Sequence, residues 1–202
     1  WELAGRWPAA ADDPIIGEQA RTLVREANEI LDEFEAMDLE ITQGVLGFFP
    51  ANRVVDDIVV YTDESRQTQR AVLHTLRQQM SRPKGRPNLA LADYVAPVGE
   101  PDWIGAFVVT GGLGIEKLVA AAEADHDDYR AIMIKAVADR LAEAFAERLH
   151  ERVRTEFWGY APNEDLDNDH LIAESYQGIR PAPGYPACPD HTEKETIFEL
   201  LE

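Results

Sequence analysis

The stretch that most narrows the possible folds reads Gly178-Ile-Arg-Pro-Ala-Pro-Gly-Tyr-Pro-Ala-Cys-Pro-Asp-His-Thr-Glu-Lys194. Its four prolines exclude a helix interior and a central strand, because proline fixes φ and lacks the backbone N–H. Ala182-Pro-Gly-Tyr185 is typical of a type II turn, with proline second and glycine third, where φ is positive. We expect a stiff, extended segment that holds Arg180 and Tyr185 around a fixed corner. Such a segment serves either as a binding rim or as a proline-rich linker between helices.

Helical periodicity dominates the chain on both sides of this segment. Asp12-Asp13-Pro14 predicts a helix start, and apolar residues at helical spacing continue from it to Phe34. Residues 115–157 predict two helices, the second of them long, because Asp125-His-Asp-Asp128 favours a break between them. The period also predicts a helix over Thr68–Met80.

The C-terminal part adds two shorter helices. Residues 167–176 predict one that ends at Gly178, since glycine is the usual residue after a helix C-terminus. Thr192 and Glu195 have the spacing of a capping box and predict a terminal helix after them.

Three apolar runs are short enough to be strands. They are Gly44–Phe49, closed by Pro50; Asp57–Tyr61, which is rich in β-branched residues; and Trp103–Thr110, which gives the strongest strand signal. Ser81–Pro87 is expected to be an exposed loop. Because strands and helices do not alternate strictly, the pattern predicts an α+β fold with a twisted, mostly antiparallel sheet flanked by helices.

Composition bounds the class of protein. A chain of 202 residues with 45% hydrophobic content can bury one core, so we expect one domain over residues 1–202. No apolar run reaches membrane-spanning length and no signal peptide is recognisable, so we expect no membrane association. The solitary Cys188 fits a reducing compartment, which predicts a cytoplasmic location. The ends at Trp1 and Glu202 suggest a domain truncated at both ends.

Charge is distributed unevenly. The net charge of −19 argues against nucleic-acid binding, which requires clustered lysine and arginine. Residues 65–86 nevertheless carry six positive charges and no acid, which leaves −25 for the remainder. This basic island is interpreted either as a dock for an acidic partner or as a solvated helix face and loop. Its members are Arg66, Arg70, Arg77, Arg82, Lys84 and Arg86.

Eight motifs together point to one family. The proline-rich segment closely resembles the signature of the activation domain of cobalamin-dependent methionine synthase, and seven further motifs follow in the family's order along the chain. They are Phe48-Phe-Pro-Ala-Asn-Arg53, Tyr94-Val-Ala-Pro97, Ile104-Gly-Ala-Phe107, Thr110-Gly-Gly112, His126-Asp-Asp-Tyr129, Ala138-Asp-Arg-Leu-Ala-Glu-Ala-Phe-Ala-Glu147 and Tyr160-Ala-Pro-Asn-Glu164.

The resemblance implies a task. Such a domain presents S-adenosylmethionine while a flavodoxin-like electron donor reduces inactive cob(II)alamin, and methyl transfer restores methylcobalamin. A methyltransferase domain of this kind is not expected to turn over alone. Cobalamin is implied to be held by the cobalamin-binding domain of the same polypeptide, and zinc by another domain of the full-length protein. The charge pattern, in its docking interpretation, makes the basic island the surface for this acidic donor.

S-adenosylmethionine requires partners for a carboxylate, an ammonium, a sulfonium and an adenine. Arg180 suits the carboxylate, because a planar guanidinium donates two parallel charge-assisted hydrogen bonds. The resemblance implies a ligand contact at this position, and the alternative is that Arg180 pairs with a surface carboxylate. Tyr185 would cover the adenine or lie against the sulfonium, or else pack on the terminal helix. Glu174 would take the ammonium, orient Arg180 or remain a solvated helix residue.

Asp139, Glu143 and Glu147 lie four residues apart and share one strip of the long predicted helix. Such a strip is usually a solvated face, which Arg140 and Arg148 partly neutralise. The resemblance instead implies that Asp139 and Glu143 lie toward the ligand and the cobalamin-bearing domain.

Other kinds of site are not indicated. A zinc site would need ligands beyond Cys188 and His191, no serine lies in a Gly-x-Ser-x-Gly elbow, and no Gly-x-Gly-x-x-Gly follows a strand. We therefore name no catalytic residue and no metal ligand. The alternative function is a non-catalytic docking module for a flavodoxin-like partner that has lost ligand binding.

Part of the family's site is expected to lie outside the chain. The family's module carries an aspartate before its Trp-x-Leu-Ala-Gly motif and a further tyrosine segment downstream, and neither element falls between Trp1 and Glu202. The groove is therefore expected to be incomplete.

Overall fold

A computed structural model describes residue 7 and residues 9–37 and 40–202. The Trp-x-Leu-Ala-Gly motif at residues 1–5 lies outside the described residues. The chain folds into two compact units, the first formed by Trp1–Gln43 and Val109–Arg148 and the second by Gly44–Val108 and Leu149–Glu202. Two strands and one helix run from one unit into the other along the chain. No helix in the described part of the chain is long and apolar enough to cross a membrane.

The first unit is mainly helical. The turn η1 (Ala9–Asp12) precedes α1 (Gly17–Ala36). The predicted helix is present, but it begins three residues after Pro14, and Asp13 Oδ1 accepts hydrogen bonds from the backbone N–H groups of Ile15 and Ile16 in the turn before it. Two more helices, α2 (Glu116–Ala124) and α3 (Asp128–Arg152), confirm the predicted pair. Their apolar faces form one core with α1, whose buried members include Ile30, Phe34, Ile134 and Val137.

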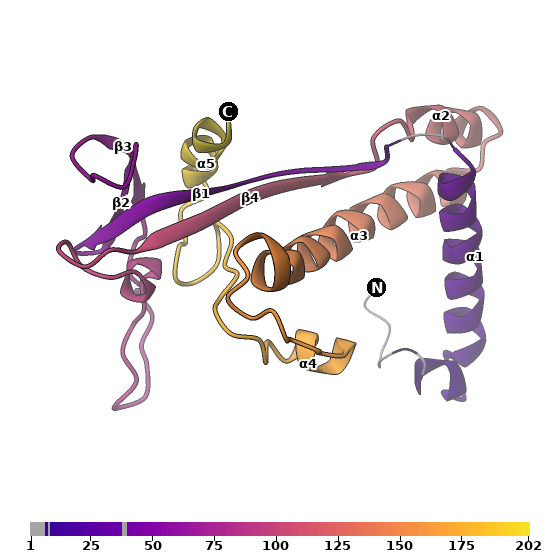
Figure 1. The fold of residues 1–202 in the computed structure, drawn as a ribbon. Coiled ribbons are helices and arrows are strands. Elements are labelled where there is room, and N and C mark those ends of the chain that lie inside the picture. Colours follow the sequence, from indigo (N-terminus) through magenta and orange to yellow (C-terminus); the bar gives the residue numbers. More distant parts are fainter. Residues whose placement is uncertain (1–6, 8, 38–39) are drawn as a thin grey trace. The chain divides into compact units, whose positions relative to one another are not determined.

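The second unit contains most of a four-stranded sheet in the order β3-β2-β1-β4 (Figure 1). Its strands are β1 (Thr42–Val54), β2 (Asp57–Tyr61), β3 (Gln69–His74) and β4 (Trp103–Gly111). Neighbouring strands are antiparallel, so the predicted α+β class with a mostly antiparallel sheet is confirmed. The turn η2 (Leu91–Tyr94) and the terminal helix α5 (Glu193–Leu201) pack on this sheet around Phe49, Ile58, Val60 and Leu200.

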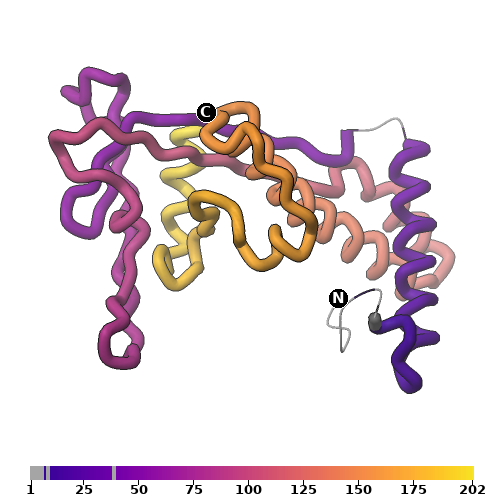
Figure 2. The backbone as a smooth tube through the Cα atoms, turned by 60° about the horizontal axis from the view of Figure 1, so that its bottom comes forward, coloured from indigo at the N-terminus to yellow at the C-terminus, as the bar shows by residue number. Residues whose placement is uncertain are grey.

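The prediction of a helix over Thr68–Met80 is wrong. Val72, Leu73 and Leu76 have helical spacing, but Ala71 and Leu73 pair with Val60 and Ile58 of β2 in an antiparallel ladder. Tertiary pairing overrides such a short periodic pattern. Beyond β3 the chain makes a long excursion whose far end is the Ser81–Pro87 loop (Figure 2).

Three smaller predictions also need correction. β1 continues through Pro50, because its ladder with β2 begins only at Ala51 and the missing N–H of proline interrupts no bond there. Helix α4 (Asn168–Ile172) ends six residues before Gly178. At the start of α5, the Thr192 side chain donates to Asp190 Oδ1 at 2.8 Å and makes no cap hydrogen bond, so the predicted capping box is absent at this described helix end.

Candidate functional site

The predicted type II turn is present in the proline-rich rim, which we define as residues 178–191. Gly184 has φ +105°, and the Tyr185 N–H donates to the Ala182 carbonyl at 3.0 Å. Two further bonds close a small loop, from Gly184 N–H to the Cys188 carbonyl at 2.8 Å and from Cys188 N–H to the Tyr185 carbonyl at 2.9 Å. The corner is therefore fixed by backbone bonds in addition to its prolines.

Cys188 anchors this loop from inside. Its thiol is buried and donates to the Ala182 carbonyl at 3.0 Å, and burial raises the pKa of the thiol. A protonated, buried thiol is structural, because reactivity requires an exposed thiolate. The Leu91 N–H donates to the Ala187 carbonyl at 2.8 Å, which ties the rim to η2 beside the sheet.

Tyr185 lies on the corner with 60% of its surface exposed. Its backbone is held by the turn and by the bridge to Cys188, so its ring is directed outward from a rigid base. An exposed aromatic ring on a fixed backbone is suited to stacking on a planar or cationic ligand group.

Behind the rim, α3 ends in one π-helical turn, Val153–Phe157, which carries a fully buried arginine. Arg154 pairs with the Glu164 carboxylate, with its Nε 2.8 Å from Oε2 and its Nη2 2.5 Å from Oε1. Its guanidinium also lies 4.3 Å from the centre of the Tyr176 ring. His150, one turn earlier, lies edge-on to the same ring at 4.9 Å. Arg154 and His150 therefore converge on Tyr176.

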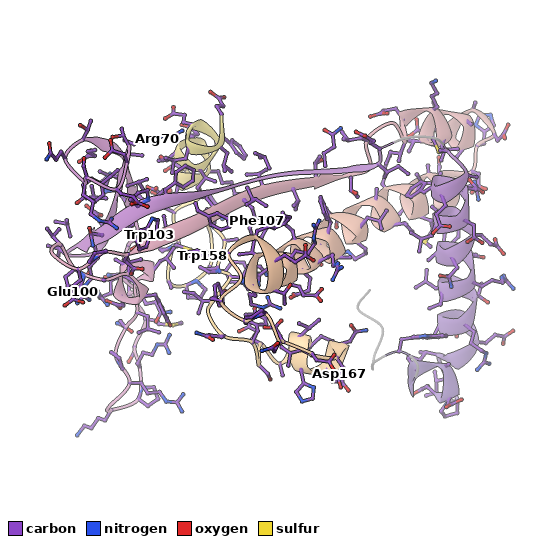
Figure 3. The ribbon with its side chains drawn as sticks, viewed as in Figure 1. Arg70, Glu100, Trp103, Phe107, Trp158 and Asp167 are labelled. Carbon is purple, nitrogen blue, oxygen red and sulfur yellow. The ribbon has the colours of Figure 1, made fainter. Side chains whose placement is uncertain are left out.

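Three aromatic side chains continue from this cluster toward the sheet, and we call them the aromatic wall: Phe48, Trp158 and Tyr160. Trp158, labelled in Figure 3, contacts Phe48 of β1 edge-on at 4.9 Å and Tyr160 at 5.8 Å. The Tyr160 hydroxyl donates to the Gln177 carbonyl at 3.4 Å, and burial raises its pKa. Gly178, with φ +96°, lies so close that a Cβ would be 3.0 Å from this hydroxyl oxygen. The rim therefore starts directly on the wall.

Arg180 follows two residues later and is half-buried. Burial, followed by the positive charges of Arg154 and then of Arg180, lowers the pKa of His150 to about 4. Arg180 therefore lies within electrostatic range of the buried cluster, at the junction between the wall and the turn.

Glu174 occupies an unusual backbone position. Helix α4 begins at an Asp167 cap, whose Oδ1 accepts from the His170 N–H at 2.9 Å. It ends in a Schellman motif, in which the Ser175 N–H bonds to the His170 carbonyl and the Glu174 N–H to the Leu171 carbonyl. Glu174 is the left-handed residue of that motif, with φ +53°, where glycine is usual. It is exposed on the chain that leads to Arg180.

Asp139 and Glu143 belong to the first unit. Both carboxylates pair with Arg140, at 2.5 Å for Asp139 and 2.9 Å for Glu143, and both side chains are 67% exposed. This arrangement fits the solvated strip, and their role toward a ligand stays a prediction.

The basic island is not a helix face. Arg77 bonds to both Asp56 and Asp93, at 2.5 and 2.7 Å, and Arg82 bonds to Gln78. Arg66 donates to the Asp102 carbonyl at 2.9 Å and stacks on Trp103, while Arg70 donates to the Leu200 carbonyl at 2.9 Å and stacks on Phe49. The loop members Lys84 and Arg86 are exposed at the far end of the excursion.

The comparisons with known proteins identify the family. Residues 1–202 match the family described as vitamin B12 dependent methionine synthase, activation domain. The chain belongs to this family. A solved structure described as the MetH reactivation domain bound to AdoHcy (S-adenosylhomocysteine) is 58% identical, with a TM-score of 0.93. All of this activation domain is covered, whereas it spans 62% of that chain. The resemblance drawn from the eight motifs is therefore confirmed.

Sequence reasoning missed the buried cluster of this activation domain, because His150 and Arg154 have the pattern of ordinary polar positions on a long helix. The sequence does contain a signal: His150 and Arg154 lie four residues apart, and each directly follows an apolar residue of the helix, Leu149 or Val153. This spacing puts both polar side chains next to the core. Glu164 lies at the end of a family motif that gave it no role.

Proposed function

We propose that this activation domain binds S-adenosylmethionine at the rim and presents its methyl group for reductive methylation of cobalamin. The observation that carries the proposal is the rim itself, which begins at the aromatic wall and carries the half-buried Arg180 and, on a rigid type II turn, the exposed Tyr185. The AdoHcy bound to the 58% identical domain supports the ligand class, because AdoHcy is what S-adenosylmethionine becomes when its methyl group is removed.

The residues present fit the chemistry of this ligand. Arg180 donates charge-assisted hydrogen bonds to the amino-acid carboxylate, and Tyr185 covers the adenine or the sulfonium face. Glu174 lies at the end of α4 for the ammonium group. Cobalamin, which another domain would hold, would supply the nucleophile that accepts the methyl group. In such a transfer the C–S bond breaks and its electron pair stays on sulfur, which leaves S-adenosylhomocysteine on this domain. This domain contributes position, because the sulfonium is already an excellent leaving group.

Calorimetric titration tests the site. The wild-type chain should bind both S-adenosylmethionine and S-adenosylhomocysteine, and Arg180→Ala should weaken both by about 10- to 100-fold, the loss expected for hydrogen bonds to a charged group. Arg86→Ala is the matched control, since it removes an exposed arginine from the Ser81–Pro87 loop and should leave affinity unchanged. Equal affinity of Arg180→Ala and wild type would show that Arg180 is not the clamp.

The electron donor is a separate proposal. We infer that a flavodoxin-like, acidic donor docks on the loop through Lys84 and Arg86, because these two charges are exposed whereas Arg77 is held by Asp56 and Asp93. Reversing both loop charges should weaken donor binding and flatten its salt dependence. Arg25→Glu, an exposed arginine of α1, is the control. The alternative, a docking module without ligand binding, is favoured if the donor binds and neither adenosyl compound does.

A further inference from the structure

The buried cluster formed by His150, Arg154 and Glu164 has no role in the ligand site described so far, although its polar groups are tightly bonded to one another. The side chains of Arg154 and Glu164 are 0% and 7% exposed, and His150 is 5% exposed. Burying a charged pair is unfavourable unless its hydrogen bonds are well made, so such a pair at the end of a π-helical turn needs a reason.

The cluster holds the chain that leads to Arg180. Tyr176 stacks on Arg154 at 4.3 Å and packs edge-on against His150 at 4.9 Å. One residue later, the Gln177 carbonyl accepts from Tyr160, and Gly178 rests on that same tyrosine. The cluster therefore holds the Tyr176 ring and Tyr160 contacts the two residues after it, so the chain is held up to Gly178, two residues before the proposed carboxylate clamp.

The geometry also sets the protonation state of His150. Nη1 of Arg154 lies 2.6 Å from His150 Nδ1, and because arginine can only donate, this nitrogen must carry a lone pair. The ring is then neutral. Its pKa is lowered to about 4, first by burial and then by the charges of Arg154 and Arg180, against the opposing effect of Glu164.

We propose that His150 and Arg154 are positioning residues for the ligand carboxylate: neutral His150 and Glu164 fix the Arg154 guanidinium, which holds Tyr176 and thereby sets where Arg180 lies. This inference rests on the proposed ligand site. Three charged groups act on His150: Arg154 on its own helix, Glu164 after the π turn and Arg180 on the rim. The charge of Arg180 couples the cluster electrostatically to the clamp.

One consequence is a coupling between ligand and His150. A carboxylate bound at Arg180 offsets part of that positive charge, so the pKa of His150 should rise when S-adenosylhomocysteine binds. By linkage, binding should then take up a fraction of a proton between about pH 4 and 5. A histidine outside electrostatic range of Arg180 would not show this shift, so the shift tests the coupling and the His150 variants test the positioning role.

The test compares two variants of His150 that differ in one property. His150→Gln keeps an acceptor for Arg154, whereas His150→Leu removes it at similar size and leaves a buried donor unpaired. By calorimetric titration at pH 7, His150→Leu should bind S-adenosylhomocysteine at least about tenfold more weakly than wild type. His150→Gln should stay within about threefold of wild type. Equal, near wild-type affinities for both folded variants would overturn the proposal.

A second measurement is independent of these variants. NMR titration of the wild-type chain should show the His150 pKa rising with S-adenosylhomocysteine, while the exposed His170 serves as control. Without any ligand, Arg180→Gln should also raise the pKa of His150, because it removes one of the two positive charges that lower this pKa. If the wild type binds no adenosyl ligand but Arg180→Gln still shifts His150, the proposed function fails and the coupling stands. If ligand binds and neither shift occurs, the positioning proposal fails alone.

Discussion

A single methyl group at Gly184 should disturb the turn that carries Tyr185. Gly184 has φ +105°, a backbone conformation that L-residues rarely adopt, and a Cβ there would overlap the ring of His191. Left-handed strain costs about 1–2 kcal/mol. Overpacking adds about 1–3 kcal/mol, and we take the lower end because the His191 ring is exposed and can turn. Gly184→Ala should therefore destabilise the chain by about 2–3 kcal/mol.

Gly99 is the matched control. It has the same φ of +105° in a turn of the same kind, closed by the Glu100 N–H on the Pro97 carbonyl at 3.2 Å, but a Cβ there would have nothing within 4 Å. Gly99→Ala should cost only the backbone strain, about 1–2 kcal/mol. Urea unfolding at constant slope measures both variants.

Removing the His191 ring completes the argument. In a Gly184→Ala, His191→Ala double variant, the excess over Gly99→Ala should disappear, since the overlap is gone and the strain remains. Affinity for S-adenosylhomocysteine should fall in Gly184→Ala and stay unchanged in Gly99→Ala. Equal costs for the two single glycine variants, or an excess that persists without the ring, would refute the reasoning.

Three further predictions concern the second unit. Val55→Asn should stabilise the chain by about 1 kcal/mol, because Val55 is 85% exposed at φ +61° and asparagine tolerates that region far better than a β-branched residue; thermal unfolding checks this. The pKa of Asp93 is lowered to about 2, chiefly by its hydrogen bond from Arg77, so this pair stabilises the fold above about pH 4 and its contribution is lost as the pH falls toward 2. Acid unfolding should therefore be less steep in Arg77→Gln. The hydrogen bond to an aspartate raises the pKa of His74, and burial raises the pKa of Glu193. Their contributions are present at low pH and are lost as the pH rises through the folded-state values, so Glu193→Gln should flatten the decline measured by urea unfolding across that range.

The sequence predicted elements best where one local signal was sufficient. Asp57–Tyr61 is a strand with the predicted bounds, and the Ala182–Tyr185 turn forms because proline and glycine leave it little choice. The helix prediction for Thr68–Met80 was wrong because the same apolar residues fit both helical spacing and strand alternation. Only pairing with the neighbouring strand β2 decides between helix and strand. Pairing partners of this kind are not visible in a local window.

For the site, the sequence predicted the residues on the rim and missed those beneath it. Arg180 and Tyr185 were singled out because the prolines mark an unusual segment, and their roles toward a ligand stay predictions. Arg154 was not, because a buried arginine in a helix has the same local pattern as an exposed one, and its partner Glu164 lies ten residues away across a turn. The role of Asp139 and Glu143 stays a prediction, since in the first unit both bond to Arg140.

Whether Arg180 binds the carboxylate of the ligand can be decided by a thermodynamic cycle. Calorimetry would compare S-adenosylhomocysteine with 5′-methylthioadenosine, which lacks the amino-acid carboxylate, on wild type and on Arg180→Ala. Arg180→Ala should weaken the binding of S-adenosylhomocysteine by about 10- to 100-fold and leave the affinity for methylthioadenosine within about twofold of wild type. An equal loss for both ligands would contradict the carboxylate clamp, because Arg180 would then act on the shared adenosyl part or on the fold.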